Sequence, residues 1–373
     1  MKVLKASFLV ILLMIILLLA SLAIYSRIGN SSVKLNIKGL GTRLLVLTYQ
    51  SSSGQGFKVI PCINGKMYAR INTDVLCGVR IASLDRNSAS RANQIRLFLE
   101  PGDDINVLGN VNSNSIGYDI VSGNALSRQY CELHKELCPL FEREYELKMK
   151  LKQNRLQEDK KLLDSLIKVV IPNRKLGFVR RHPDYELSAD ILNEDRYVSH
   201  DTIMQYSKLL TENVRNHLFG IMLFQFIDGW NNTEKGELTP DFEEETVSGD
   251  KISLNGLRGK YVILDFWGSW CSWCIKDLLD MKACYHKYKH RIVFVGVACH
   301  DKKTTLENIL NKHSIEWPNI LDDEHPNNIR MKYGISVFPT KVIIGKDGRV
   351  IEKIVGESVK FYSVVDSLMN GNS

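Results

Sequence analysis

Cys271 and Cys274 are separated by two residues, and this pair is the part of the sequence best suited to carry chemistry. Residues three apart lie on the same face of a helix, so the two sulfur atoms can meet within disulfide geometry. A thiolate attacks a substrate disulfide, and a second thiol close by then resolves the mixed disulfide. The spacing therefore predicts thiol–disulfide exchange at these two cysteines.

The flanking sequence predicts that the pair lies where a buried strand gives way to a helix. Tyr261–Phe266 is an apolar run interrupted only by Asp265, and a helix is predicted from Cys271 to Lys289. Because the first N–H groups of a helix are unpaired and this end is partly positive, a thiolate there has a pKa below the free value of about 8.5. This position favours a redox-active dithiol.

The remaining cysteines argue against other uses of the pair. A zinc site would need a second pair of ligands at metal spacing, but Cys284 and Cys299 stand singly, so no metal is expected. An inert structural disulfide would not explain the preceding strand and the aromatic approach through Trp267. A cross-strand disulfide between Cys62 and Cys77 is conceivable. The default for the other six cysteines is a free buried thiol: Cys62, Cys77, Cys131, Cys138, Cys284 and Cys299.

Elements that must position the pair are predicted on its C-terminal side. They are strands at Arg291–Ala298, Thr340–Gly345 and Arg349–Val355, and helices at Thr304–His313 and Val359–Met369. Lys346-Asp347-Gly348, between the last two strands, is typical of a hairpin turn. The predicted order is strand, helix, strand, helix, hairpin and a final helix. This order predicts an α/β domain over residues 236–373.

Residues 33–125 predict a different architecture. Short segments with alternating apolar residues, such as Arg43–Tyr49 and Met67–Ile71, are separated by turn signals. Asn64-Gly65 predicts a type I′ hairpin. Several short strands at this spacing predict a small all-β sandwich or open barrel.

Residues 126–235 change character again and predict a helical linker region. Two stretches, Leu126–Ile171 and about Thr202–Phe226, have apolar residues at helical spacing. Cys131 and Cys138 would lie about 10 Å apart along a continuous helix, which is too far for a disulfide. Pro139 can break that helix.

The uncharged apolar run Ala6–Tyr25 follows Lys2 and Lys5. It is long enough to span about 30 Å of hydrocarbon as a helix, so residues 1–29 predict a membrane segment. An uncleaved signal anchor is favoured over a cleaved signal, and either would send residues 30–373 across a membrane. The net charge of +7 is spread along the chain without a compact basic tract, so nucleic acid is not an expected partner.

The sequence around the cysteines resembles a known family. Asp265-Phe266-Trp267 followed by Trp270-Cys271-x-x-Cys274 resembles the active site of thioredoxins. Over about residues 236–368 the sequence resembles the TlpA/ResA branch, which are exported, membrane-tethered bacterial thiol–disulfide oxidoreductases of the redoxin/AhpC-TSA superfamily. The stretches that support this are Pro240-Asp241-Phe242, Leu257-Arg258-Gly259-Lys260, Phe338-Pro339-Thr340 and Lys346-Asp347-Gly348. More weakly, residues 33–125 resemble the β domain that precedes the thioredoxin-like domain in many such proteins.

The resemblance implies a thioredoxin-like fold and a role for each residue that matches the motifs. Cys271 would attack the substrate and Cys274 would resolve the mixed disulfide. Pro339 would be a cis-proline that faces the sulfurs, and the backbone of the neighbouring Phe338 would bind an extended substrate. Trp270 would also belong to the substrate-binding surface.

The resemblance also implies two candidate acids. Asp265 occupies the place of the buried acid beneath the sulfurs of thioredoxin, where a carboxylate has a raised pKa and can accept a proton as Cys274 attacks. Asp277, three residues after Cys274, occupies a position that is usually glutamate in the exported reductases. An exposed position near the start of a helix is the alternative for Asp277. The family commonly has proline at the position of Trp273, which here adds a large apolar surface beside the thiol, either as a partner contact or only as cover.

Together these observations predict an exported, membrane-anchored reductase of protein disulfides in the bacterial cell envelope, held at the inner membrane with periplasmic domains. Its expected partners are protein thiols and disulfides and an upstream electron donor in the membrane, and no cofactor is expected beyond the Cys271–Cys274 disulfide. A thiol peroxidase of the same superfamily is an alternative, but the segment before Cys271 lacks the threonine and the proline-rich loop that it needs. A partner-binding module without enzymatic activity is another alternative.

Overall fold

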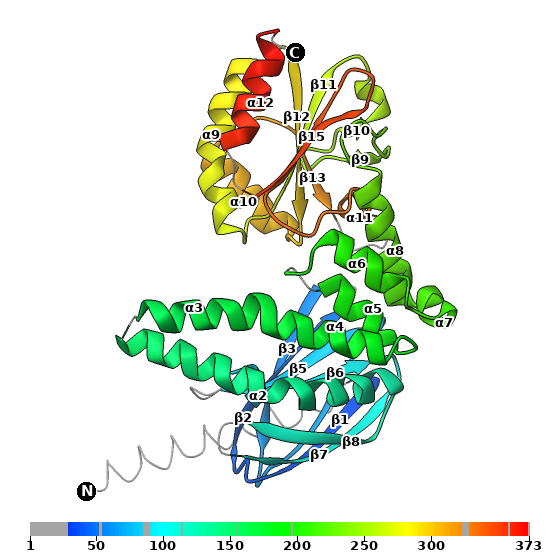
Figure 1. Cartoon of the computed structure of the whole chain (residues 1–373), viewed down its shortest axis with the longest axis vertical. Coiled ribbons are helices and arrows are strands. Elements are labelled where there is room, and N and C mark those ends of the chain that lie inside the picture. Colours follow the sequence, from blue (N-terminus) through cyan, green and yellow to red (C-terminus); the bar gives the residue numbers. More distant parts are fainter. Residues whose placement is uncertain are drawn as a thin grey trace, which may run out of the picture. The chain divides into compact units, whose positions relative to one another are not determined.

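The computed structural model of the chain describes residues 29–51, 54–84, 90–112, 115–154, 156–194, 197–322, 328–356 and 359–371 (Figure 1). The chain divides into two compact units, which meet in sequence between Ile191 and Leu192. The predicted membrane segment, apart from Gly29, lies outside the described residues. Within the described ranges, no helix has the length and apolar character needed to cross a membrane.

The first unit contains the predicted all-β domain. Its strands are β1 (Ser31–Lys38), β2 (Arg43–Ser51), β3 (Gly54–Cys62), β4 (Lys66–Ile71), β5 (Cys77–Ser83), β6 (Ile95–Leu99), β7 (Asp104–Val111) and β8 (Ile116–Ser122). These strands form two four-stranded sheets, in the orders β4-β1-β7-β8 and β3-β2-β5-β6. Apolar residues of both sheets share one core, so the domain is a sandwich. The strand β8 was not among the predicted segments.

The turn between β3 and β4 has the backbone expected of type I′, but the predicted hairpin is wrong, because the two strands belong to different sheets. Asn64 and Gly65 both have positive φ, 52° and 78°, as this turn requires. A Cβ atom on Gly65 would lie 2.1 Å from the carbonyl oxygen of Ile37, so no larger residue fits there. The isolated bridge between Ile63 and Lys66 closes the turn, which carries the chain from β3 in one sheet to β4 in the other.

Helices α2 (Ala125–Asn154), α3 (Gln157–Ser165), α4 (Ile171–Arg181) and α5 (Glu186–Glu194) follow, with a π-helical turn at Leu166–Val170. The helix α2 runs through Pro139 without ending. One face of α2, with Leu133, Leu137 and Phe141, is buried, and α2 packs on β6 and β8. This burial offsets the backbone hydrogen bond that proline cannot make.

The predicted separate helical linker, residues 126–235, is corrected by the structure, because the boundary between the two units falls inside it. Helices α2 and α4 pack with the first unit. The stretch predicted at Thr202–Phe226 consists of α6 (His200–Ser207), α7 (Glu212–Asn216) and α8 (Leu218–Asn231), which belong to the second unit. The helix α8 packs against α11 (Ile329–Lys332), and a Cβ atom on Gly229 would lie 2.2 Å from the carbonyl oxygen of Met331.

The second unit has the predicted α/β architecture. Five of its described strands form a mixed sheet in the order β13-β12-β11-β14-β15, and β9 (Glu243–Glu245) and β10 (Lys251–Ser253) form a separate two-stranded sheet. The strands of the mixed sheet are β11 (Tyr261–Trp267), β12 (Ile292–Cys299), β13 (Asn319–Asp322), β14 (Thr340–Ile344) and β15 (Val350–Val355). The strands β11, β12 and β13 are parallel, whereas β14 is antiparallel to both of its neighbours.

Helices cover both faces of this sheet (Figure 1). Side chains of α9 (Ser272–Tyr288), α10 (Lys303–His313) and α12 (Val359–Met369) share one core with one face of the sheet. The helix α11 and the segment around β9 (Glu243–Glu245) and β10 (Lys251–Ser253) lie on the other face. Parallel strands covered on both faces must be apolar throughout, which explains the continuous apolar runs in the sequence.

Candidate active site

The cysteine pair lies at the junction of β11 and α9, as the sequence predicts. Cys271 is the N-cap of α9, and the backbone N–H of Cys274 donates a hydrogen bond to the Sγ atom of Cys271 at 3.2 Å. The two residues form a disulfide with a Cα–Cα distance of 5.2 Å. Cys271 is 6% exposed and Cys274 is 3% exposed. After reduction, a thiolate at Cys271 would keep the helix N-terminus as a stabilising partner.

The segment between β11 and α9 is held by its two tryptophans. The indole N–H of Trp267 donates to the Oδ1 atom of Asn319 at 3.0 Å, in the buried core. The indole N–H of Trp270 donates to the carbonyl oxygen of Cys299 at 2.9 Å. Both bonds tie the segment to β12 or β13, so the position of Cys271 is set by the sheet.

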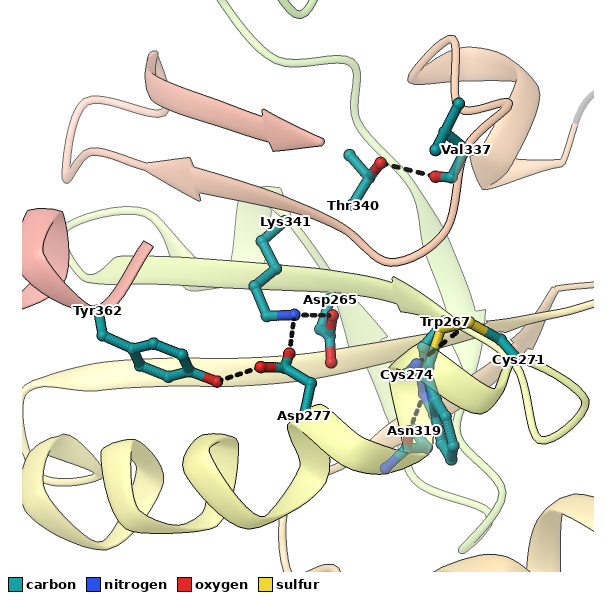
Figure 2. Close-up of polar contacts among 10 residues, drawn as sticks. All are labelled: Asp265, Trp267, Cys271, Cys274, Asp277, Asn319, Val337, Thr340, Lys341 and Tyr362. Atoms are coloured by element: carbon teal, nitrogen blue, oxygen red, sulfur yellow. Dashed lines mark hydrogen bonds and ion pairs between the residues drawn. A yellow bond between two sulfur atoms is a disulfide. The ribbon is translucent and has the colours of Figure 1, made fainter. Parts of the chain in front are cut away.

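Three buried charged groups lie near the disulfide, and Figure 2 shows them together. The ammonium of Lys341 lies 3.2 Å from the Oδ1 atom of Asp265 and also donates to the Oδ2 atom of Asp277. The hydroxyl of Tyr362 donates to the Oδ1 atom of Asp277 at 2.6 Å. The two acids that the sequence offers as candidates therefore share one lysine, and the exposed alternative for Asp277 is wrong.

The two carboxylates differ in how well they are satisfied. Asp277 accepts a hydrogen bond at each oxygen, whereas the buried Oδ1 atom of Asp265 accepts none of ordinary geometry among the described residues. Burial raises the pKa of Asp265, the charge of Lys341 lowers it, and that of Asp277 raises it again. Asp265 is therefore the carboxylate with spare capacity to accept a proton.

Burial lowers the pKa of Lys341, but the two carboxylates more than offset this effect and leave it raised. The lysine is therefore charged at neutral pH. Sequence reasoning missed both Lys341 and Tyr362. For Lys341 a signal existed, because a lysine inside the otherwise apolar run Thr340–Ile344 must find a partner when the strand is buried on both faces. Nothing in the sequence marked Tyr362, which is half-buried on α12 between the buried Phe361 and the exposed Ser363.

The segment before β14 carries the predicted cis-proline. The peptide bond between Phe338 and Pro339 is cis. The hydroxyl of Thr340 donates to the carbonyl oxygen of Val337 at 2.7 Å, which closes the turn. The ring of Phe338 packs edge-on against that of Trp270 at a centroid distance of 5.4 Å. Two of the residues assigned to substrate binding are thus in contact.

Apolar surface surrounds the disulfide. Trp270 is 49% exposed and Trp273 is 56% exposed. The ammonium of Lys276 lies 4.5 Å from the centroid of the Trp273 ring, a cation–π contact on the surface of α9. Exposed aromatic rings beside a reactive disulfide are typical of a partner-binding surface.

The other six cysteines are free thiols. Five are buried and Cys138 is half-buried, so the predicted free thiols are confirmed and the Cys62–Cys77 pair does not form. The continuous helix α2 also keeps Cys131 and Cys138 apart, as predicted. Within the described residues no cluster of three or more histidine, cysteine or acidic side chains could hold a metal ion.

Comparisons with known proteins agree with this geometry. Residues 236–353 match the AhpC/TSA family. The thiol-disulfide oxidoreductase ResA of Bacillus thuringiensis (strain Al Hakam) is 33% identical over 143 residues, which cover 38% of this chain and 82% of the relative. The chain belongs to the ResA family of thiol-disulfide oxidoreductases. ResA of Bacillus subtilis (strain 168) is 29% identical over 143 residues, which cover 38% of this chain and 78% of the relative.

Solved structures similar to this ResA-family chain include one described as the thiol:disulfide interchange protein DsbE from Chlorobium tepidum. It is 26% identical, the match covers 37% of this chain and 96% of that one, and the TM-score is 0.34. On the evidence of its ResA relatives, the protein is a thiol-disulfide oxidoreductase, as the motif predicts. The family match lies within the second unit, and the alternative of a module without enzymatic activity is wrong for that unit.

Proposed function

We propose that this ResA-family enzyme reduces disulfides in protein substrates outside the cytoplasm, using Cys271 and Cys274 as its dithiol. The observation that carries the proposal is the disulfide at the N-terminus of α9, beside the exposed rings of Trp270 and Trp273. The helix N-terminus supports a thiolate at Cys271, and the aromatic surface supports a protein as the partner.

In the first step, the thiolate of Cys271 attacks one sulfur of the substrate disulfide. A bond forms between the Sγ atom of Cys271 and that sulfur, and the substrate's own sulfur–sulfur bond breaks. The second substrate sulfur leaves as a thiolate and takes a proton from solvent. Cys271 is assigned the attack because its Sγ atom accepts the backbone N–H bond at the helix N-terminus.

In the second step, the thiol of Cys274 loses its proton and attacks the Sγ atom of Cys271. The mixed disulfide breaks, the substrate sulfur that was joined to Cys271 leaves as a thiolate and takes a proton from solvent, and two electrons have passed from the enzyme to the substrate. We assign the carboxylate of Asp265 as the acceptor of the Cys274 proton, because its Oδ1 atom is buried and lacks a hydrogen bond of ordinary geometry. The charge of Lys341 opposes the rise that burial causes in the pKa of Asp265 and so favours the ionised carboxylate that can take the proton.

The oxidised enzyme must then be reduced again, and an upstream dithiol in the membrane is proposed for this task. The apolar run Ala6–Tyr25, after Lys2 and Lys5, supports an anchor at the inner membrane with the two units on the periplasmic side. A cleaved signal would give the same side without the anchor. Fractionation of cells that express the full chain distinguishes the two, because only an uncleaved anchor keeps the protein with the membranes.

The function is tested by reduction of insulin driven by dithiothreitol. We expect the full chain to accelerate the reaction, the Cys271→Ser variant to be inactive, and the Cys274→Ser variant to accumulate a mixed disulfide with the substrate. Cys284→Ser is the matched control, since that buried thiol lies on the same helix. An unchanged rate for Cys271→Ser would overturn the proposal.

A further inference from the structure

A cavity of about 620 Å³ in the second unit adjoins the segment that carries Pro339. Helices α6 and α8 supply one wall, with His200 and Trp230, and the segment from Gly334 to Thr340 supplies another. Side chains of β15, including Lys353, complete the lining. The cavity therefore depends on the helices that precede the thioredoxin-like domain as well as on that domain itself.

Aromatic contacts connect this cavity with the disulfide. His300 and Phe338 both line the cavity, and their ring centroids lie 6.2 Å and 5.4 Å from that of Trp270. Trp270 immediately precedes Cys271 in the chain. An extended peptide joined to Cys271 and lying against Trp270 and Phe338 can thus place a neighbouring side chain in the cavity.

The cavity contains the ammonium group of Lys353, which has no counter-ion among the residues that the structure describes. The Nζ atom of Lys353 donates to the hydroxyl of Thr233 at 2.8 Å and to the carbonyl oxygen of Tyr333 at 2.9 Å, and it lies 4.2 Å from the centroid of the Trp230 ring. These partners are neutral, and no carboxylate of the described residues lies within ion-pair distance. Burial lowers the pKa of Lys353 to about 7, against an opposing effect of the charge of Glu234. A buried cation in this state gains from an added anion.

Other described residues that line the cavity also favour an anion. The ring of His200 stacks on Trp230 at 4.6 Å, and its buried Nε2 atom has no hydrogen-bond partner among the described residues. Arg330 also lines the cavity, and Glu194 is the one acidic side chain among the described lining residues. The described lining residues thus present two basic side chains and an unused imidazole nitrogen against a single carboxylate.

We propose that this cavity binds an acidic side chain of the protein substrate, close in sequence to the cysteine that Cys271 attacks. The substrate carboxylate accepts a charge-assisted hydrogen bond from Lys353 and a second hydrogen bond from the Nε2 atom of His200. Arg330 adds attraction without direct contact. This inference rests on the proposed function and specifies its substrate class: proteins with a glutamate or aspartate near the reducible disulfide.

The test uses peptide disulfides that differ in one residue, glutamate or glutamine, at each position within about four residues of the cysteine, a range set by the reach of an extended chain. The full chain, reduced with dithiothreitol, is assayed for kcat/KM on each pair. We expect at least one glutamate peptide to be preferred about tenfold over its glutamine partner. The preference should fall toward one in Lys353→Met. Because Lys353→Met also removes two internal hydrogen bonds, Arg330→Gln and His200→Ala test the cavity independently, and each should lower the preference.

The matched control is Lys312→Met, which removes an exposed cation on α10 outside the cavity and should leave the preference unchanged. Equal rates for glutamate and glutamine at every position would overturn the cavity inference while leaving the proposed function standing. A preference for glutamate that is unchanged in Lys353→Met, Arg330→Gln and His200→Ala would also overturn the cavity inference and leave the proposed function standing. If no peptide is reduced, the proposed function fails and the cavity inference falls with it.

Discussion

Lys341 and Asp265 are direct register partners on the antiparallel strands β14 and β11, and their side chains form a buried ion pair of 3.2 Å. The same ammonium bonds to Asp277 on α9, the helix that carries the cysteines. Two carboxylates and one ammonium therefore share a buried site, which carries a net charge of −1 when all three are ionised. This unbalanced charge allows Asp265 to take up a proton during turnover.

The first prediction concerns the role of Asp265 as a base. Asp265→Asn should lower kcat/KM for protein disulfides by about 10²-fold at neutral pH, because Cys274 then loses its proton to water. The mixed disulfide with Cys271 should persist for longer and be detectable after acid quenching. Because the pKa of Asp265 is raised, the wild-type rate should fall on acidification at a pH above the usual range for aspartate. This acid limb of the pH–rate profile should be absent in Asp265→Asn.

Asp277→Asn is the matched control for that experiment, because it alters the other carboxylate bound to Lys341. Both oxygens of Asp277 already accept hydrogen bonds, so its effect on the rate should be smaller than that of Asp265→Asn. If the two variants lose activity equally and the mixed disulfide does not accumulate, Asp265 is not the proton acceptor.

The second prediction concerns stability and its pH dependence. A buried acid with a raised pKa in the folded state lowers the free energy of unfolding at any pH above that folded pKa. The cost shrinks as the pH falls below the folded pKa, and it is gone below the pKa of an unfolded aspartate, about 3.9. Because the pKa of Asp265 is raised, Asp265→Asn should be more stable than the wild type at pH 7. Urea unfolding at several pH values should show this advantage shrinking toward pH 4. A less stable variant at pH 7 would mean that the ion pair with Lys341 outweighs the cost of burial.

The third prediction concerns the lysine itself. Lys341→Met leaves two buried carboxylates without a cation and should cost about 3–5 kcal/mol of unfolding free energy at pH 7. The loss should be smaller at acidic pH, where the carboxylates protonate. The acid limb of the rate should move to higher pH, since Lys341 lowers the pKa of Asp265. The double variant with Asp265→Asn should recover part of the stability, and a purely additive loss would show that the two residues do not interact.

Much of the fold could be predicted because it follows from periodicity. The helix Val359–Met369 and the strands on either side of the cysteines have strong, uniform patterns, and their observed bounds agree with the prediction to within a residue or two. The strands β8 and β13 were missed. The strand β13 has only 4 residues, and in β8 only Ile116 and Tyr118 are buried, so their patterns are weak. The unit boundary within the helical region was missed because it depends on which sheet each helix covers, a long-range property.

The reactive centre was partly predictable for a similar reason. The spacing of Cys271 and Cys274 predicts their role, and the place of Asp265 in an apolar strand predicts that its carboxyl group is buried. The contact between Asp277 and Lys341 could not be predicted, because it joins residues 64 positions apart on different elements. The sequence presents two candidate acids as alternatives, whereas in three dimensions they form one system.

The fourth prediction concerns the buried thiols of the reduced protein. Burial raises the pKa of Cys284 to about 12 and that of Cys131 to about 11, and burial together with the charge of Asp74 raises that of Cys77 to about 11. At pH 8 their thiolate fraction is about one in a thousand or less, so native alkylation with iodoacetamide should modify Cys271 first and leave these three unmodified. Mass spectrometry before and after denaturation checks this. Equal labelling of Cys284 and Cys271 in the native protein would contradict it.

The fifth prediction concerns the aromatic surface on α9. Trp273 and Leu279 are both exposed on this helix, at 56% and 72%, but only Trp273 lies between the two cysteines. If Trp273 contacts the substrate, Trp273→Ala should raise KM for a protein disulfide by about tenfold, because truncation of an aromatic anchor costs more than about 1 kcal/mol. Leu279→Ala removes exposed apolar surface farther along the helix and should leave KM unchanged. A small disulfide reagent, which is not a polypeptide and does not reach Trp273, should be reduced with a similar KM by both variants. If Trp273→Ala instead changes the rate with this reagent as strongly as with a protein, the tryptophan acts on the disulfide itself and not on partner binding.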